Sequence, residues 1–188
     1  MKSIDVLHYL ILRFYDIYGK PLYGRKKIQK LMFLIEHYDL KDKKVRKSKG
    51  LTGYKFLIWT YGPFSKEIYD DLDRLIDEEL IREEVVGSDS MSMIEGIVLD
   101  SYIDDGYPKR MFIYRPNSRH FKDDLDYLKS ELSVDVVNTV DNVLRMFGNL
   151  MPYELESLVN KLLHLDLPKK IKYWGLSIDE YLEREGIA

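Results

Sequence analysis

The sequence Y-K-F-L-I-W-T-Y-G-P-F-S-K-E-I, residues 54–68, decides the fold of this 188-residue chain. Residues 54–61 are rich in aromatic and β-branched side chains, which favour a strand. The Gly-Pro pair that follows is predicted to break the strand, because proline fixes φ at a value suited to a first helical turn. Ser65 is a candidate N-cap for the next helix. The stretch therefore predicts a strand, a corner and a helix, with Tyr61 and Phe64 fixing the corner in the core.

The hydrophobic pattern places two helices before this stretch. Residues 4–18 carry apolar side chains on two faces, which indicates a largely buried helix. A second helix is predicted to begin between Leu22 and Arg25, with apolar positions among residues 28–35 on its buried side and its lysines facing outward. The lysine-rich residues 41–50 lack such periodicity and are predicted to form an exposed loop.

A β-hairpin is predicted after the third helix. Residues 82–86 form its first strand, residues 87–92 read as a turn, a returning strand lies within residues 94–103, and residues 110–114 supply another. Helix, helix, strand, helix and hairpin is the element order of a winged helix. The third helix would then occupy the recognition position.

The rest of the sequence is helical. Apolar stripes predict three further helices, over residues 121–132, 136–147 and 152–163, the last opened by Pro152. After Pro168, a capping box at residues 177–180 predicts a short last helix. We expect an α+β, mainly helical fold, with a winged-helix-like domain over residues 1–116 and a C-terminal helical subdomain over residues 117–188 packed on it.

Composition excludes several classes of protein. There is no cysteine, so neither a disulfide framework nor a thiolate metal site can form. No apolar run approaches the ~20 residues that a membrane-spanning helix needs. The first five residues lack the features of a signal peptide. We therefore expect a cytoplasmic protein.

The residue patterns of common active sites are missing. The four histidines, His8, His37, His120 and His164, lack the spacing of a metal site. The acidic residues at 123–126 lie at a predicted helix start, where they favour the helix dipole. No glycine-rich phosphate loop or nucleophile elbow occurs. The sequence therefore predicts no catalytic residue, no cofactor, no metal and no enzyme activity. An active site assembled from residues distant in sequence would leave no such pattern and is the alternative.

Basic residues gather early in the chain, although its net charge is −3. Residues 20–49 contain eleven Lys and Arg and only three acidic residues. A basic stretch can bind phosphates through charge alone, but a charge run is more often only solvated. The nucleic-acid-binding candidates are Arg25, Lys26, Lys27, Lys30, Lys44, Arg46 and Lys47.

Acidic residues gather on the predicted third helix. Residues 65–84 contain nine acidic and three basic residues. Such a helix would bring like charge to a phosphate-lined groove and suits a basic protein better than DNA. The protein-binding candidates are Phe64, Lys66, Glu67, Asp70, Asp71 and Arg74.

Two segments also carry a resemblance to a known family. G-R-K-K-I-Q-K-L-M-F, residues 24–33, resembles a pattern in which a basic sequence opens an amphipathic helix, and Y-G-P-F-S-K-E-I, residues 61–68, resembles its partner motif. Together they resemble the YwgA family, which is similar to the Panacea (SocA-like) antitoxin domain, over residues 4–86. The length of residues 87–109 departs from a short wing.

The resemblance implies a non-enzymatic regulatory domain, since Panacea-type relatives neutralise toxins by binding them and SocA-like ones can deliver a toxin to a protease. Two functions follow from the sequence. A protein-binding, antitoxin-like module is favoured by the acidic third helix. A winged-helix DNA-binding transcriptional regulator, using the basic stretch over residues 25–49, is the alternative. A homodimer through the terminal helices is a further option.

Overall fold

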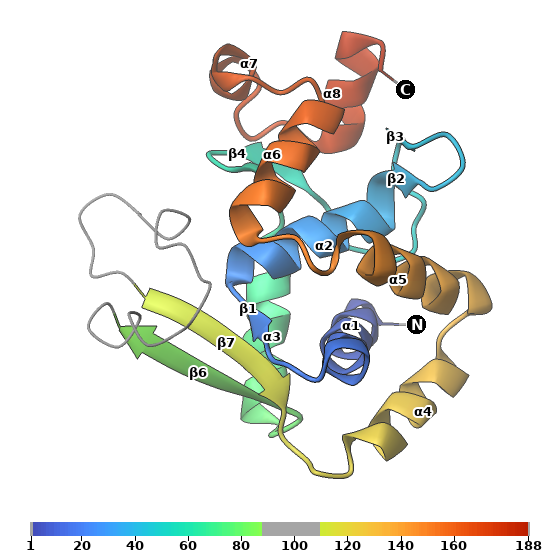
Figure 1. Ribbon diagram of the computed structural model, residues 1–188. Helices are drawn as coiled ribbons and strands as arrows, with labels where there is room; N and C mark the ends of the chain where they lie inside the picture. The colour runs from blue at the N-terminus through green and yellow to red at the C-terminus, as the bar shows by residue number, and fades with distance from the viewer. Residues whose placement is uncertain (1, 88–109, 188) are drawn as a thin grey trace.

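The computed structural model describes residues 2–87 and 110–187, which form a mainly helical α+β protein with small antiparallel sheets (Figure 1). The helices are α1 (Ser3–Tyr18), α2 (Arg25–His37), α3 (Glu67–Asp77), α4 (Phe121–Glu131), α5 (Val134–Phe147), α6 (Pro152–Leu162), α7 (Leu167–Lys172) and α8 (Ile178–Glu185). None of the helices in these ranges is long and apolar enough to cross a membrane.

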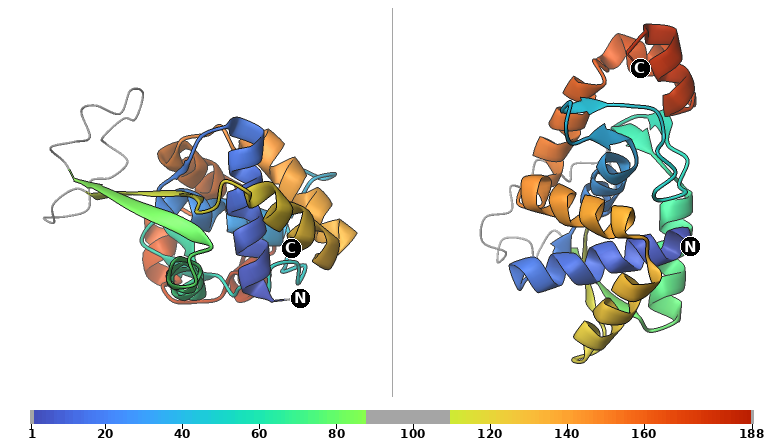
Figure 2. Two further views of the ribbon diagram at one scale, coloured as in Figure 1. Left: turned by 90° about the horizontal axis from the view of Figure 1, so that it is seen from below. Right: turned by 90° about the vertical axis from the view of Figure 1, so that its right-hand side faces the viewer.

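Three small sheets complete the fold. The largest is antiparallel in the order β1-β7-β6, formed by β1 (Leu22–Tyr23), β7 (Arg110–Pro116) and β6 (Ile81–Gly87). The other two are the pairs β2 (Tyr38–Asp39) with β3 (Lys44–Val45), and β4 (Leu57–Trp59) with β5 (Gly62–Phe64). The β6–β7 arm extends away from the helical body, as the left view of Figure 2 shows.

Helix α2 lies at the centre of the molecule and is buried along almost its whole length (Figure 1). It contacts α5, α6 and β5, while α1 contacts α3, α4 and α5. One hydrophobic cluster contains residues of α1, α2 and α3 together with residues of α4, α5, α6 and α8. The predicted packing of the C-terminal helices onto the N-terminal half is therefore present.

The corner at residues 54–68 differs from its prediction. The Gly-Pro pair does not break a strand but lies within β5, where Pro63 pairs with Ile58 of β4. Gly62 has φ 88°, and an added Cβ would collide with the Asn160 side chain of α6, so glycine is required there. A β-hairpin thus replaces the single strand expected over residues 54–61.

Ser65 is not the N-cap of α3, which is Lys66. Its Oγ is buried and has no hydrogen-bond partner among the described residues. Its backbone is held instead by the side-chain amide of Gln29 on α2, which donates to the Ser65 carbonyl at 2.7 Å and accepts from the Ser65 N–H at 2.9 Å. Neither aromatic residue of the corner is in the core as predicted, since 37% of Tyr61 is exposed and Phe64 is only half-buried.

The remaining elements follow the pattern with several differences. The pattern does not predict strands β1 and β2. The segment at residues 41–50 is mostly exposed as expected, yet it contains β3, whose Val45 is buried. The predicted turn beyond Gly87 and the predicted strand within residues 94–103 lie outside the described residues. Two helices, α7 and α8, stand where one was expected, and Ser177 caps α8 as predicted, accepting from the Glu180 N–H at 3.3 Å.

We predict that Gln29→Leu lowers the free energy of unfolding by about 2–4 kcal/mol, because it leaves the buried N–H and C=O of Ser65 without a partner. Chemical denaturation followed by far-UV circular dichroism measures this loss. Lys129→Leu, at an exposed position of α4, is the control and should change stability by less than about 0.5 kcal/mol. Equal stability of the two variants would contradict the role assigned to Gln29.

Candidate functional site

The polar side chains that open α2 bind other parts of the protein. The Arg25 guanidinium donates to the Tyr114 hydroxyl at 2.8 Å and forms an ion pair with Glu83 at 2.9 Å, which ties α2 to β6 and β7. The Lys26 ammonium forms an ion pair with Glu156 of α6 at 2.7 Å. These two cations are therefore already neutralised within the fold.

Lys27 and Lys30 do not face outward as predicted, because both are buried. The Lys27 ammonium donates to the carbonyls of Gly148 at 2.5 Å and Leu150 at 2.8 Å, at the C-terminal end of α5, where a cation satisfies unpaired carbonyl groups. The Lys30 ammonium donates to the Pro63 carbonyl in β5 at 2.8 Å. Burial lowers the pKa of Lys27 to about 8 and the pKa of Lys30 to about 7.

The other nucleic-acid-binding candidates lie on the segment that follows α2. Lys44 is exposed on β3, Arg46 forms an ion pair with Asp42 at 2.5 Å, and Lys47 forms one with Glu183 of α8 at 2.5 Å. The seven candidates therefore do not make one exposed basic surface. Their shared role in phosphate binding has no support in this arrangement.

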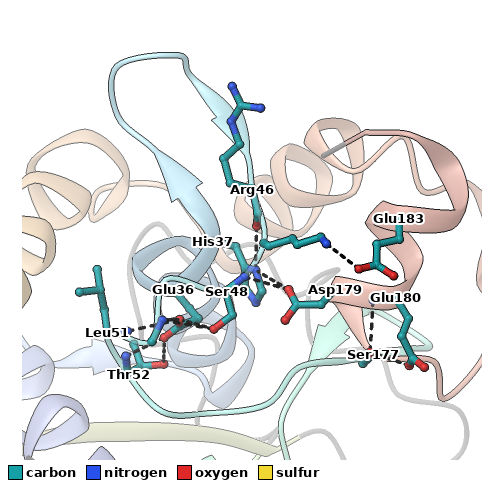
Figure 3. A network of polar contacts seen from close by, with 12 residues as sticks. Glu36, His37, Arg46, Ser48, Leu51, Thr52, Ser177, Asp179, Glu180 and Glu183 are labelled. Carbon is teal, nitrogen blue, oxygen red and sulfur yellow. Dashed lines mark hydrogen bonds and ion pairs between the residues drawn. The ribbon is translucent and has the colours of Figure 1, made fainter.

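A buried carboxylate organises the loop after β3 (Figure 3). Glu36 of α2 accepts hydrogen bonds from the Ser48 hydroxyl at 2.7 Å and from the N–H and hydroxyl of Thr52, both at 2.6 Å. Burial raises the pKa of Glu36, but these hydrogen bonds outweigh it and hold the pKa below its usual value. The contacts fix the loop to α2.

The same region contains a serine, a histidine and an aspartate, the residue types of a catalytic triad. They line part of a pocket of about 380 Å³ (Figure 3). However, the Ser48 hydroxyl donates to Glu36, and His37 Nδ1 lies 3.0 Å from the Arg46 carbonyl, to which it donates. Asp179 accepts from the backbone N–H of Ser48 at 2.8 Å.

Nucleophilic catalysis requires a hydrogen bond from the serine hydroxyl to the histidine. Among the described residues, no hydrogen bond joins the Ser48 hydroxyl to the His37 imidazole. No group of three or more His, Cys, Asp or Glu side chains that could hold a metal ion occurs within residues 2–87 and 110–187. The cluster instead links α2, its following loop and α8.

The protein-binding candidates lie together on α3 and the residues directly before it. Four of them are exposed: Lys66, Glu67, Asp70 and Arg74. Asp71 is half-buried, accepts from the Tyr54 hydroxyl at 2.7 Å and pairs with Arg74 at 3.2 Å. Asp70, Asp73 and Asp77 are all exposed at helical spacing, and we call them the acidic face of α3.

Phe64 belongs to a row of four aromatic rings, which we call the aromatic patch. The Trp174 and Trp59 ring centroids are 4.4 Å apart, those of Trp59 and Phe64 are 6.1 Å apart, and those of Phe64 and Tyr69 are 5.3 Å apart. The row leads from the end of α7, across β4 and β5, to α3. Trp59 is 41% exposed and Trp174 is 49% exposed.

Backbone hydrogen bonds hold the two tryptophans side by side. The residues after α7 run along β4, where the Gly175 N–H donates to the Ile58 carbonyl and the Ile58 N–H donates to the Leu176 carbonyl, both at 2.9 Å. Because Ile58 points into the core, its neighbours Leu57 and Trp59 point to the other face of the strand and are exposed. The exposed rings are thus placed by rigid backbone pairing.

Sequence reasoning missed both tryptophans as functional candidates. One signal was available, since residues 56–59 are all apolar and successive strand residues point to opposite faces. If the side chains on one face of this strand pack into the core, the apolar side chains on its other face are left on the surface. Nothing in the local sequence pairs Trp59 with Trp174.

The fold is that of a mainly helical α+β protein with an exposed aromatic patch. Residues 28–162 match the family described as antitoxin SocA-like, Panacea domain. The chain belongs to this family. The resemblance to the Panacea domain is thereby confirmed, whereas the resemblance to YwgA stays a prediction.

The matched residues run from α2 to the end of α6, so they omit residues 4–27 of the range predicted from the two motifs and extend past residue 86. No curated protein and no solved structure shows detectable similarity to the chain. The family assignment therefore rests on the sequence from α2 to α6.

We predict that the free energy of unfolding rises with pH between pH 7 and 9, and that Lys30→Met reduces this slope. The pKa of Lys30 is about 7 in the folded protein and near 10.5 when unfolded, so between these values the unfolded chain binds more protons. Stability therefore increases as the pH rises, by up to about 1.4 kcal/mol per pH unit.

Urea unfolding at pH 7, 8 and 9 measures the slope, with Lys129→Met as the exposed control. Lys27 contributes to the slope in the same direction and remains in both variants. An identical slope for the wild type and Lys30→Met would show that Lys30 is not desolvated in the folded state.

Proposed function

We propose that this protein is a non-enzymatic regulatory module that acts like an antitoxin by binding another protein. The observation that carries the proposal is the aromatic patch, whose two tryptophans are exposed while their backbone is fixed. Membership of the antitoxin SocA-like, Panacea domain family supports it. We place the contact at the aromatic patch and the neighbouring acidic face of α3.

The patch has the features of an energetic hot spot for binding. Tryptophan and tyrosine are enriched at such hot spots because they bury a large area and lose few rotatable bonds. Leu57, which lies on the same strand as Trp59, is also exposed and extends the apolar area. Because backbone pairing holds Trp59 and Trp174 in place, little ordering is needed on binding.

Charge indicates the kind of partner. The acidic face of α3 adjoins the aromatic patch through Tyr69. Lys66 and Lys55 are exposed nearby, but the acidic residues of α3 outnumber its basic residues. A protein with a basic rim around an apolar recess is the complementary partner.

We also propose that residues 1–116 form a winged-helix-like unit and residues 117–188 a helical subdomain. The order α1, β1, α2, α3, β6, β7, with strands β2–β5 inserted between α2 and α3, and the sheet order β1-β7-β6 support the first part. In such a unit α3 holds the recognition position, and here it presents acidic side chains. The position that would contact DNA in a regulator would therefore contact a protein.

We predict that Trp59→Ala and Trp174→Ala each weaken partner binding about 10–100-fold and leave the fold intact, because both rings are about half exposed. The partner is sought by co-expressing the chain with the product of the neighbouring gene, and its affinity is measured by isothermal titration calorimetry. Tyr127→Ala is the matched control, since this ring is 64% exposed on α4, away from the patch.

If the control weakens binding as much as the tryptophan variants, the contact lies elsewhere. If no complex forms with the wild-type chain at moderate salt, the antitoxin-like function itself is contradicted.

A further inference from the structure

Helix α7 carries an exposed apolar stripe that the core does not use. Leu167 is 70% exposed, Ile171 is 69% exposed and Trp174, just beyond the helix, is 49% exposed. Leu167 and Ile171 are four residues apart and so lie on one side of α7, which is the spacing of anchor residues that dock a helix onto another protein, and Trp174 follows two residues after the helix. Exposed apolar residues grouped in this way mark an interaction surface.

Lysines surround the α7 stripe. Lys172 is exposed, Lys170 is half-buried, and Lys169 is half-buried and pairs with Glu185 of α8 at 2.5 Å. Burial lowers the pKa of Lys170, while Glu156 of α6 raises it and Lys26 lowers it. Asp166 caps α7 and Lys169 is paired, so Lys170 and Lys172 leave a small excess of positive charge beside the apolar residues of α7.

The α7 stripe and the acidic face of α3 lie at opposite ends of the aromatic patch. The four rings form a row from Trp174 at α7 to Tyr69 on α3, and Figure 1 shows α7 above the β4 hairpin with α3 below it. Along this row the surface passes from basic, through apolar, to acidic.

We propose that this surface binds a second copy of the chain. A two-fold axis through the aromatic patch sets the α7 stripe of each copy against the acidic face of α3 of the other, so that opposite charges meet twice and the exposed rings meet at the centre. A surface that is basic at one end, acidic at the other and apolar between is self-complementary under such an axis. The dimer does not depend on the antitoxin-like function, but it covers the same patch, so partner and second copy compete.

The test uses two charge-reversed variants of the full chain. One is Lys170→Glu with Lys172→Glu on α7, and the other is Asp70→Lys with Asp73→Lys on α3. Each variant alone sets like charges against each other at both contacts and is expected to be monomeric. An equimolar mixture restores opposite charges at both contacts and is expected to form a heterodimer. Sedimentation velocity without any partner protein measures all three samples.

The wild type is expected to dimerise with a dissociation constant on the order of 10 μM that increases with salt. Ile171→Ser removes apolar area without changing charge and should weaken the dimer at least about tenfold. Lys122→Glu with Lys129→Glu on α4 is the matched control and should dimerise like the wild type.

Four results would overturn the proposal: a wild type that stays monomeric at 200 μM, reversed variants that dimerise like the wild type, a mixture that stays monomeric, or species larger than a dimer. Larger species would indicate head-to-tail association in place of the two-fold arrangement. Because no partner is present, each result is independent of the partner-binding measurement.

Discussion

The side chains of Gln29 and Lys30 on α2 hold the backbone of the corner that leads into α3, and the rest of the structure depends on this contact. A buried N–H or C=O without a partner costs roughly as much as a well-made hydrogen bond contributes. Gln29 satisfies both backbone groups of Ser65, and Lys30 satisfies the Pro63 carbonyl. The same turns of α2 send Lys27 to the end of α5. One central helix thus fixes the hairpin, α3 and the C-terminal helices relative to each other.

This arrangement explains how a basic motif and an aromatic corner, distant in sequence, form one structural unit. The basic motif has a structural role, because its cations are buried or paired within the fold. The corner it fixes is the β4–β5 hairpin, which presents Trp59 on its outer face. The segment after α7 pairs with β4 and brings Trp174 to the same place. The polar contacts inside the protein therefore determine the position of an apolar surface outside it.

Much of the fold could be predicted because it follows local rules. Apolar periodicity located α1, α5 and α6, and the capping pattern at Ser177 located α8. The direction of Lys27 and Lys30 could not be predicted, since long side chains with apolar stems can reach distant carbonyls as readily as water. Whether these lysines are buried depends on the elements that pack against α2, and these elements, β5, α5 and α6, are distant from α2 in the sequence. The pairing of the two tryptophans has the same origin, because it arises from backbone bonds between segments that no local pattern connects.

The central claim is that partner binding occurs at the aromatic patch and not at the basic stretch. Amide hydrogen exchange of the chain, alone and in complex with the protein it binds, tests this claim most directly. The account predicts slower exchange on binding over residues 57–69 and 171–177, with residues 41–49 unchanged. Slower exchange confined to residues 41–49, with the hairpin and the end of α7 unaffected, would contradict it.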